Sequence, residues 1–176
     1  MAEATAPAGA WKDGRFYFPA RVYYENTDAG GIVYYANYLK FAERARTEFL
    51  RVIGFNQQPG LEADERAGFV VRHCEIDYRA PAVLDDLLEI SCEVKEFGGA
   101  SAVICQEIVR NGQVLVSLEV KVVYVLLKNK RPARIPAELA EKMSSCRYSV
   151  SGAGVWSEEA AKRLMGKGQR FVEFAV

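Results

Sequence analysis

Apolar residues recur along this chain with two different periods, which predict a sheet and one long helix. Between residues 38 and 53 they recur at three- and four-residue steps, as on the single apolar face of a helix. Asn37 is a suitable N-cap for this helix, and Gly54 is a suitable stop. The pattern therefore predicts a helix of about 17 residues, starting at Asn37 and close to 25 Å long.

Alternating, strand-like segments flank that helix on both sides. Residues 16–24 alternate before it, and further segments follow over 69–78, 87–96, 101–110 and 113–127. Asn111-Gly112 is the strongest hairpin signal in the chain, because both central residues of a type I′ turn need a positive φ. Pro19 cannot donate a hydrogen bond within a sheet, so the first strand should lie at an edge or bulge there.

A single amphipathic helix needs a sheet to cover its apolar face, and antiparallel strands can keep one face apolar. We therefore predict an α+β fold in which an antiparallel five-stranded sheet wraps around one long central helix. Residues 1–14 are expected to form a flexible N-terminal tail, 15–128 the folded domain and 129–176 a C-terminal extension of unclear role. Short helices are expected over 136–144 and 157–165.

Composition narrows the classes of function. The chain has 23 basic and 23 acidic residues, which argues against a nucleic-acid binder and makes self-association more favourable. Its four cysteines form no CxxC pair and its one histidine is His73, so we expect no metal site and a reduced, cytoplasmic protein. Neither a secretory signal nor an apolar stretch of about 20 residues is expected, so the protein should not be integral to a membrane.

The candidate catalytic residues lie in the loop before the helix. Asp28 is followed by Gly30 and Gly31, which let the backbone approach a ligand closely. The helix start beyond them offers unsatisfied N–H groups and the positive end of a dipole, which can stabilise a developing oxyanion. Asp28 can act there as a nucleophile or as a general base, although an aspartate in a glycine loop can also simply cap a turn.

Residues 21–51, which include Thr27-Asp-Ala-Gly-Gly and Asn37-Tyr-Leu, closely resemble the signature of the 4-hydroxybenzoyl-CoA thioesterase-like hotdog family. They are nearest to its Tol-Pal-associated acyl-CoA thioesterase branch. The likeness extends through Phe69-Val-Val-Arg, Tyr78-Arg-Ala-Pro and Leu84-Asp-Asp-Leu-Leu-Glu-Ile to about Pro136. It implies a hotdog fold, hydrolysis of acyl-CoA without a cofactor, and Asp28 as the catalytic aspartate.

The resemblance also implies roles for neighbouring residues. Tyr24 corresponds to a tyrosine that lines the site, although a core or interface aromatic is an equal alternative. Tyr35 stands where the nearest branch usually has histidine. The backbone N–H of Tyr35 can still donate to the thioester oxygen, but the chain has no imidazole at this position to carry a proton. Gly30, Gly31 and Asn37 are expected to contact substrate.

Other readings stay open from the sequence. A non-catalytic acyl-CoA binder or assembly protein is one, and a dehydratase using His73 is another. Glu43 on the helix is a further candidate for the catalytic carboxylate, but the sequence favours dimer packing or a salt bridge for it. Basic side chains could meet the phosphates of coenzyme A, namely Arg79, Lys128, Lys130, Arg131 and Arg134. Family members imply a homodimer or homotetramer with sites between subunits, and the sequence does not define the acyl group.

Overall fold

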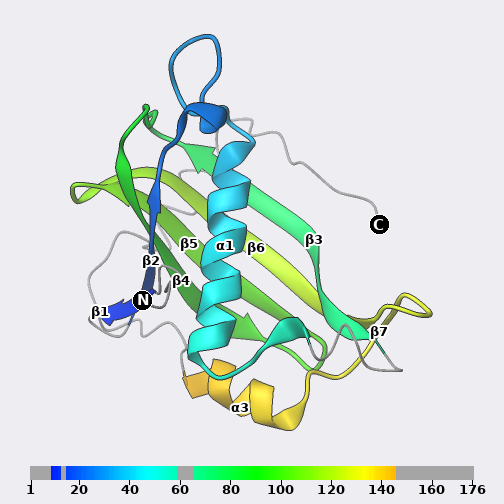
Figure 1. Cartoon of the computed structure of the whole chain (residues 1–176). Coiled ribbons are helices and arrows are strands. Elements are labelled where there is room, and N and C mark those ends of the chain that lie inside the picture. The colour runs from blue at the N-terminus through cyan, green and yellow to red at the C-terminus, as the bar shows by residue number, and fades with distance from the viewer. Residues whose placement is uncertain (1–8, 13–14, 59–65, 146–176) are drawn as a thin grey trace, which may run out of the picture.

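The computed structural model describes residues 9–12, 15–58 and 66–145 (Figure 1). Its elements, in chain order, are β1 (Ala10–Lys12), β2 (Arg15–Arg21), a 3₁₀ turn (Tyr24–Asn26), α1 (Asn37–Val52), β3 (Ala67–Tyr78), β4 (Leu87–Phe97), β5 (Ser101–Arg110), β6 (Gln113–Leu126), β7 (Arg131–Pro132) and α3 (Ala137–Ser145).

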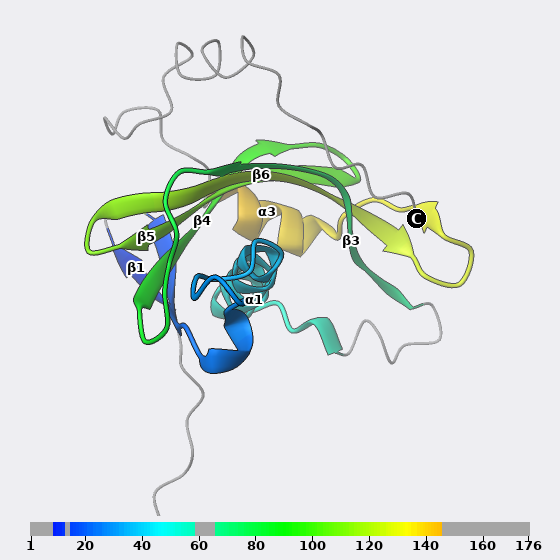
Figure 2. The ribbon, with the colours of Figure 1, turned by 90° about the horizontal axis from the view of Figure 1, so that it is seen from above.

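The strands form a single antiparallel sheet in the order β1-β2-β4-β5-β6-β3, with β7 paired to β6. Seen from above, this sheet curves over α1 (Figure 2). The predicted α+β arrangement of a sheet wrapped around one long helix is confirmed. The predicted number of strands is wrong, because the described residues form a sheet of seven strands rather than five. The two extra strands contain three and two residues, which is too few for an alternating pattern to be recognised in the sequence.

The core lies between α1 and the concave face of the sheet. From the helix, Phe41, Ala45 and Phe49 are almost completely buried. They meet inward-facing side chains of β4, β5 and β6, among them Leu88, Ile90, Ile108 and Leu118. Along β4, every second residue from Leu88 to Val94 belongs to this core, as the period of two requires.

Local turn chemistry follows the sequence in most places. Gly54 follows the end of α1 with a φ of 82°, and the hairpin between β5 and β6 has φ angles of 50° at Asn111 and 79° at Gly112. Pro19 pairs with Glu89 of β4 but lies beyond the reach of β1, so this part of β2 is an edge. The N-cap prediction is wrong: Ala36 holds that position without a side-chain cap, and Asn37 is the first helical residue.

Strand β3 ends one side of the sheet and pairs with β6 alone. It is 12 residues long, and most of its side chains are half-buried or exposed. Its pairing shifts register between Val71 and His73, which marks a bulge at Arg72. A long unpaired strand edge presents free backbone donors and acceptors, so β3 is the part of this sheet best suited to pair with another chain.

Parts of both flanking segments belong to the folded unit. Strand β1 pairs with β2, and α3 buries Leu139 and Met143 in the core. The folded structure therefore extends beyond 15–128 on both sides. The helix expected over 157–165 lies outside the described residues.

Truncating Leu139 should destabilise the whole domain, because its side chain is 2% exposed and belongs to the main core. We expect Leu139→Ala to lower the free energy of unfolding by about 2–5 kcal/mol. Denaturant titration followed by circular dichroism measures this loss. Glu141→Ala on the exposed side of the same helix is the control, and equal stabilities of the two variants would show that α3 is not part of the cooperative unit.

Candidate active site

The loop that carries Asp28 is a tight, hydrogen-bonded turn ahead of α1. The Asp28 N–H donates to the Ile32 carbonyl at 2.9 Å, and the Gly31 N–H donates to the Asp28 carbonyl at 3.0 Å. The Gly30 N–H donates to Asp28 Oδ1 at 2.8 Å, so the turn fixes the carboxylate of an otherwise exposed side chain. A Cβ at Gly30 would lie 3.1 Å from that oxygen, and Gly31 has a φ of 74°. Both glycines therefore allow the tight turn that holds the Asp28 carboxylate in place.

Two buried asparagines attach this turn to the helix. The Asn26 carbonyl accepts hydrogen bonds from the Tyr34 N–H and from Asn37 Nδ2, both at 2.9 Å. Asn26 Oδ1 accepts from the Tyr23 N–H at 2.8 Å. Asn26 and Asn37 are each only 5% exposed. The Asn37 amide thus ties the loop to the start of α1, and its expected contact with substrate stays a prediction.

The start of α1 leaves backbone donors unused. The Asn37 N–H bonds the Tyr34 carbonyl, and the Leu39 N–H bonds the Ala36 carbonyl. By contrast, the N–H groups of Tyr35 and Ala36 donate to no acceptor among the described residues. Such N–H groups at a helix start attract negative charge. They supply the kind of donor that was expected to polarise a thioester carbonyl.

Tyrosines surround these donors. The Tyr78 hydroxyl on β3 donates to the Tyr35 carbonyl at 3.1 Å, which fixes the peptide that follows Tyr35. Burial raises the pKa of Tyr78 to about 12, so this hydroxyl keeps its proton at physiological pH. The Tyr34 and Tyr35 rings lie 4.6 Å apart. Hydrogen bonding to Tyr35 raises the pKa of Tyr34, and the negative charge of Asp28 raises it further. Tyr34 therefore stays neutral close to Asp28.

Tyr24 does not lie where the sequence suggested. The strand-like pattern placed it at the end of the first strand, but β2 ends at Arg21 and Tyr24 begins the 3₁₀ turn. Its side chain is 83% exposed, so within one chain it lines no enclosed space. The side chain of Tyr35, which follows the Asp28 turn in the sequence, is 60% exposed. The catalytic roles expected for Tyr24 and Tyr35 stay predictions.

Other candidates of the sequence lie apart from the loop or have partners of their own. His73 lies on the edge strand beside Glu75, with 3.4 Å between Nε2 and Oε1. Arg79 bonds Asp77 at 3.0 Å. The basic residues Lys128, Lys130, Arg131 and Arg134 are exposed around β7. Among the described residues no cluster of His, Cys, Asp and Glu is arranged to hold a metal ion.

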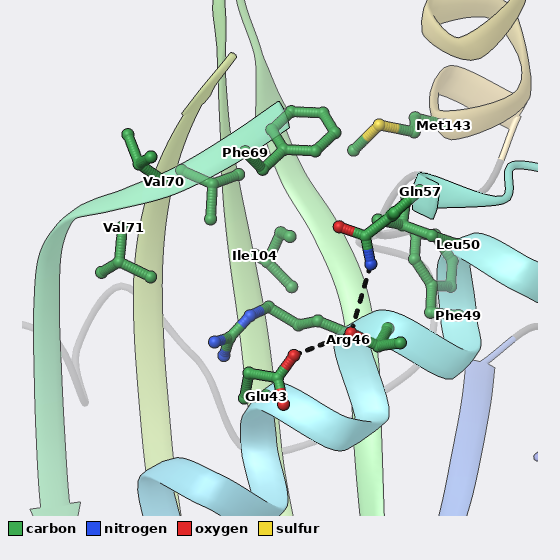
Figure 3. Close-up of a pocket in the computed structure, with 12 residues that line it drawn as sticks. Glu43, Arg46, Phe49, Leu50, Gln57, Phe69, Val70, Val71, Ile104 and Met143 are labelled. Carbon is green, nitrogen blue, oxygen red and sulfur yellow. Dashed lines mark hydrogen bonds between the residues drawn. The ribbon is translucent and has the colours of Figure 1, made fainter. Parts of the chain in front are cut away.

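A small pocket lies between the C-terminal half of α1 and the start of β3 (Figure 3). Its volume is about 110 Å³. Apolar side chains form most of its wall, including Phe49, Phe69 and Ile104, while Glu43 and Arg46 contribute charges. This pocket was not predicted from the sequence. A signal was available, because Arg46 falls four residues after Ala42 and three before Phe49, within the apolar stripe of the helix.

Comparison with known proteins places the chain in a family. The model of the thioesterase-like superfamily matches residues 22–143. The acyl-CoA thioesterase YbgC of Haemophilus influenzae is 49% identical over 127 residues, covering 72% of this chain and 93% of the relative. The acyl-CoA thioester hydrolase YbgC of Escherichia coli is 47% identical over 125 residues, covering 70% and 92%.

A solved structure supports the same family membership. The crystal structure of a probable thioesterase from Bartonella henselae superposes with a TM-score of 0.67 and 39% identity, covering 69% of this chain and 99% of that one. The fold and the family match thus define a hotdog-fold thioesterase. The chain belongs to the thioesterase-like superfamily, and the resemblance inferred from residues 21–51 is confirmed. In the described part of the chain, no helix has the length and apolar character needed to span a bilayer.

Proposed function

We propose that this protein hydrolyses the thioester bond of acyl-coenzyme A, with Asp28 as the catalytic carboxylate. The observation that carries the proposal is an exposed carboxylate, fixed by the Gly30 N–H, in a turn that leads to unused N–H donors at Tyr35 and Ala36. The thioester oxygen would accept from the Tyr35 N–H. Negative charge that develops on this oxygen would then be stabilised in place.

The reaction needs no cofactor. In one route Asp28 removes a proton from a water molecule that attacks the carbonyl carbon, and in the other Asp28 attacks that carbon itself and forms an acyl–Asp28 anhydride that water then hydrolyses. In both routes the carbon–sulfur bond breaks, the coenzyme A thiolate leaves and takes up a proton that comes from the water, and the acyl group is released as a carboxylic acid with Asp28 restored. Thiolate is a good leaving group, so the absence of a histidine at residue 35 leaves this route intact. The acyl-CoA thioesterase names of the relatives support the same reaction.

We further propose that the protein works as a homodimer, with two dimers forming a homotetramer. The free edge of β3 supports this assembly, because antiparallel pairing of two β3 strands would join two sheets into one. The exposed tyrosines at the Asp28 loop would gain cover from a second chain. Cys74, Cys92 and Cys105 are free thiols, which fits the reducing cytoplasm that we propose as its location.

A panel of acyl-CoA esters tests the function, with release of free coenzyme A thiol as the readout. We expect turnover well above the uncatalysed rate for at least one acyl group. Tight binding of acyl-CoA without thiol release would instead favour the alternative, a non-catalytic binding or assembly protein. Light scattering on the same preparation gives the oligomeric state, and a monomer with full activity would contradict a site shared between chains.

A further inference from the structure

Hydrogen bonds hold the backbone on both sides of residue 35. The Tyr34 carbonyl accepts from the Asn37 N–H at 2.8 Å, and the Tyr35 carbonyl accepts from the Tyr78 hydroxyl at 3.1 Å. Because each peptide group is planar, fixing the two groups that flank a residue also fixes its φ and ψ angles. The direction of the Tyr35 N–H, which is the donor proposed for the thioester oxygen, therefore depends on both bonds.

Tyr78 is the only donor to the Tyr35 carbonyl in the described part of the chain. In a regular α-helix this carbonyl would accept from the N–H of residue 39. The Leu39 N–H donates instead to the Ala36 carbonyl at 3.2 Å, and α1 begins at Asn37. The bond that completes the anchoring of residue 35 therefore comes from a side chain of β3.

The strand and two neighbouring tyrosines hold Tyr78 in place for this bond. Tyr78 is the last residue of β3, and the N–H of the next residue, Arg79, donates to the Leu115 carbonyl at 2.8 Å. The Tyr78 ring lies 5.8 Å from the ring of Tyr38, which is only 3% exposed, and 6.4 Å from the ring of Tyr35. The hydroxyl that meets the loop is thus positioned by the sheet and by a buried residue of α1.

The Tyr78 hydroxyl has one proton to donate, and the Tyr35 carbonyl takes it. Burial, together with Cys74, Tyr35 and Tyr38, raises the pKa of Tyr78 to about 12, so the hydroxyl is a neutral donor at physiological pH. A phenol carries a single proton, so the hydroxyl that bonds the Tyr35 carbonyl cannot also donate to a thioester oxygen. It is therefore placed to act on developing charge through residue 35.

Resting on the proposed function, we propose that Tyr78 is a positioning residue that holds the Tyr35 N–H in the direction that the thioester oxygen requires. Donors that are aimed in advance stabilise developing charge because they need no reorganisation as the reaction proceeds. Without the Tyr78 hydroxyl, residue 35 would rotate more freely, and part of the bound complexes would present its N–H in another direction. The oxygen carries more charge in the transition state than in the bound substrate, so the loss falls mainly on kcat.

Removing the Tyr78 hydroxyl tests this role. Tyr78→Phe keeps the ring beside Tyr35 and Tyr38 and loses the hydrogen bond to the Tyr35 carbonyl. We expect kcat for acyl-CoA to fall about three- to tenfold, the size of one net hydrogen bond, while KM changes by less than about twofold. Steady-state kinetics by thiol release measures both constants. A folded Tyr78→Phe protein with the kcat of wild type would overturn the proposal.

Tyr38→Phe is the matched control, because it removes a tyrosine hydroxyl with a structural partner. The Tyr38 hydroxyl accepts from the Ala82 N–H at 2.8 Å, and this bond is buried. Its loss leaves a buried N–H without an acceptor, which should lower the midpoint of thermal unfolding while kcat stays close to wild type. Tyr78→Phe should show the opposite result, a lower kcat and a smaller change of the midpoint. A fall of kcat in proportion to the lost stability in both variants would overturn a positioning role.

A fluorinated tyrosine adds a pH dependence that a purely structural role would not produce. Replacing Tyr78 by 2,3,5-trifluorotyrosine keeps the hydroxyl but makes it much more acidic. The phenolate that forms as the pH rises has no proton for the Tyr35 carbonyl, so kcat should fall over a pH range in which wild-type kcat does not. Circular dichroism over the same range shows whether the protein stays folded. A pH profile identical to that of wild type would overturn the proposal, even if Tyr78→Phe does not fold.

Failure of this proposal is distinguishable from failure of the proposed function. Full kcat in Tyr78→Phe beside an inactive Asp28→Asn protein would overturn only the role of Tyr78. Full activity of Asp28→Asn would overturn only the catalytic carboxylate, because the Tyr78 comparison measures the donor to the thioester oxygen.

Discussion

Asp28→Asn is expected to lower kcat/KM for acyl-CoA by about a hundred- to ten-thousand-fold, the range measured for loss of a positioned acid–base group. The amide oxygen of asparagine can still accept the hydrogen bond from the Gly30 N–H, so the turn should keep its shape. What is lost is the charged oxygen that attacks the thioester or activates water. Steady-state kinetics by thiol release measures the effect.

The matched control for this variant is Glu25→Gln. Glu25 is an exposed carboxylate three residues earlier, at the 3₁₀ turn. Its replacement removes the same charge from the same region of the surface without touching the Asp28 turn. We expect its kcat/KM to stay within about twofold of wild type, as for a surface change remote from the chemistry. Similar losses in both variants would point to a general electrostatic effect on acyl-CoA binding instead of catalysis by Asp28.

Tyr35→Pro is expected to lower kcat by about a hundred- to a thousand-fold, because proline has no N–H to donate to the thioester oxygen. Ala36→Pro removes the neighbouring donor, and the φ of −71° at Ala36 already suits proline. We expect only a small loss there. Tyr35→Phe removes the hydroxyl but keeps the backbone donor, so its activity should stay within a few-fold of wild type.

These three variants separate backbone from side-chain contributions at residue 35. Circular dichroism and the midpoint of thermal unfolding show whether α1 still forms in each one. A Tyr35→Pro protein that is folded and fully active would contradict the role of this N–H. A large loss in Tyr35→Phe would instead move the chemistry to the tyrosine hydroxyl, which replaces the histidine usual in the nearest branch.

The long helices and strands were predictable because the spacing of their apolar residues repeats over many positions. Helix α1 and strands β3 to β6 each contain at least ten residues, enough for a helical or alternating pattern to register. Strands β1 and β7 contain three and two residues. Strand β1 pairs with the free edge of β2, and β7 pairs with the end of β6, which extends past its pairing with β5. Such pairing depends on tertiary structure and leaves no local pattern.

Side-chain roles were less predictable than the positions of the elements. Asn37 has the residue type of an N-cap, yet its amide bonds the Asn26 carbonyl, 11 residues earlier, and Ala36 takes the capping position. Asp28 could be singled out from the loop and the family resemblance. Arg46 could have been noticed within the apolar stripe of the helix, but the wall of its pocket could not be predicted, because it combines α1, β3, β5, β6 and α3, which only the folded chain brings together.

In the proposed mechanism the Asp28 carboxylate and the N–H groups at the start of α1 act on the same bound thioester. A crystal structure with a non-hydrolysable acyl-CoA analogue, in which a methylene group replaces the thioester sulfur, tests it most directly. We expect the carbonyl oxygen within about 3 Å of the Tyr35 nitrogen, and the carbonyl carbon within about 3.5 Å of an Asp28 oxygen or of a water that Asp28 holds. An analogue bound with its carbonyl away from both residues would contradict it.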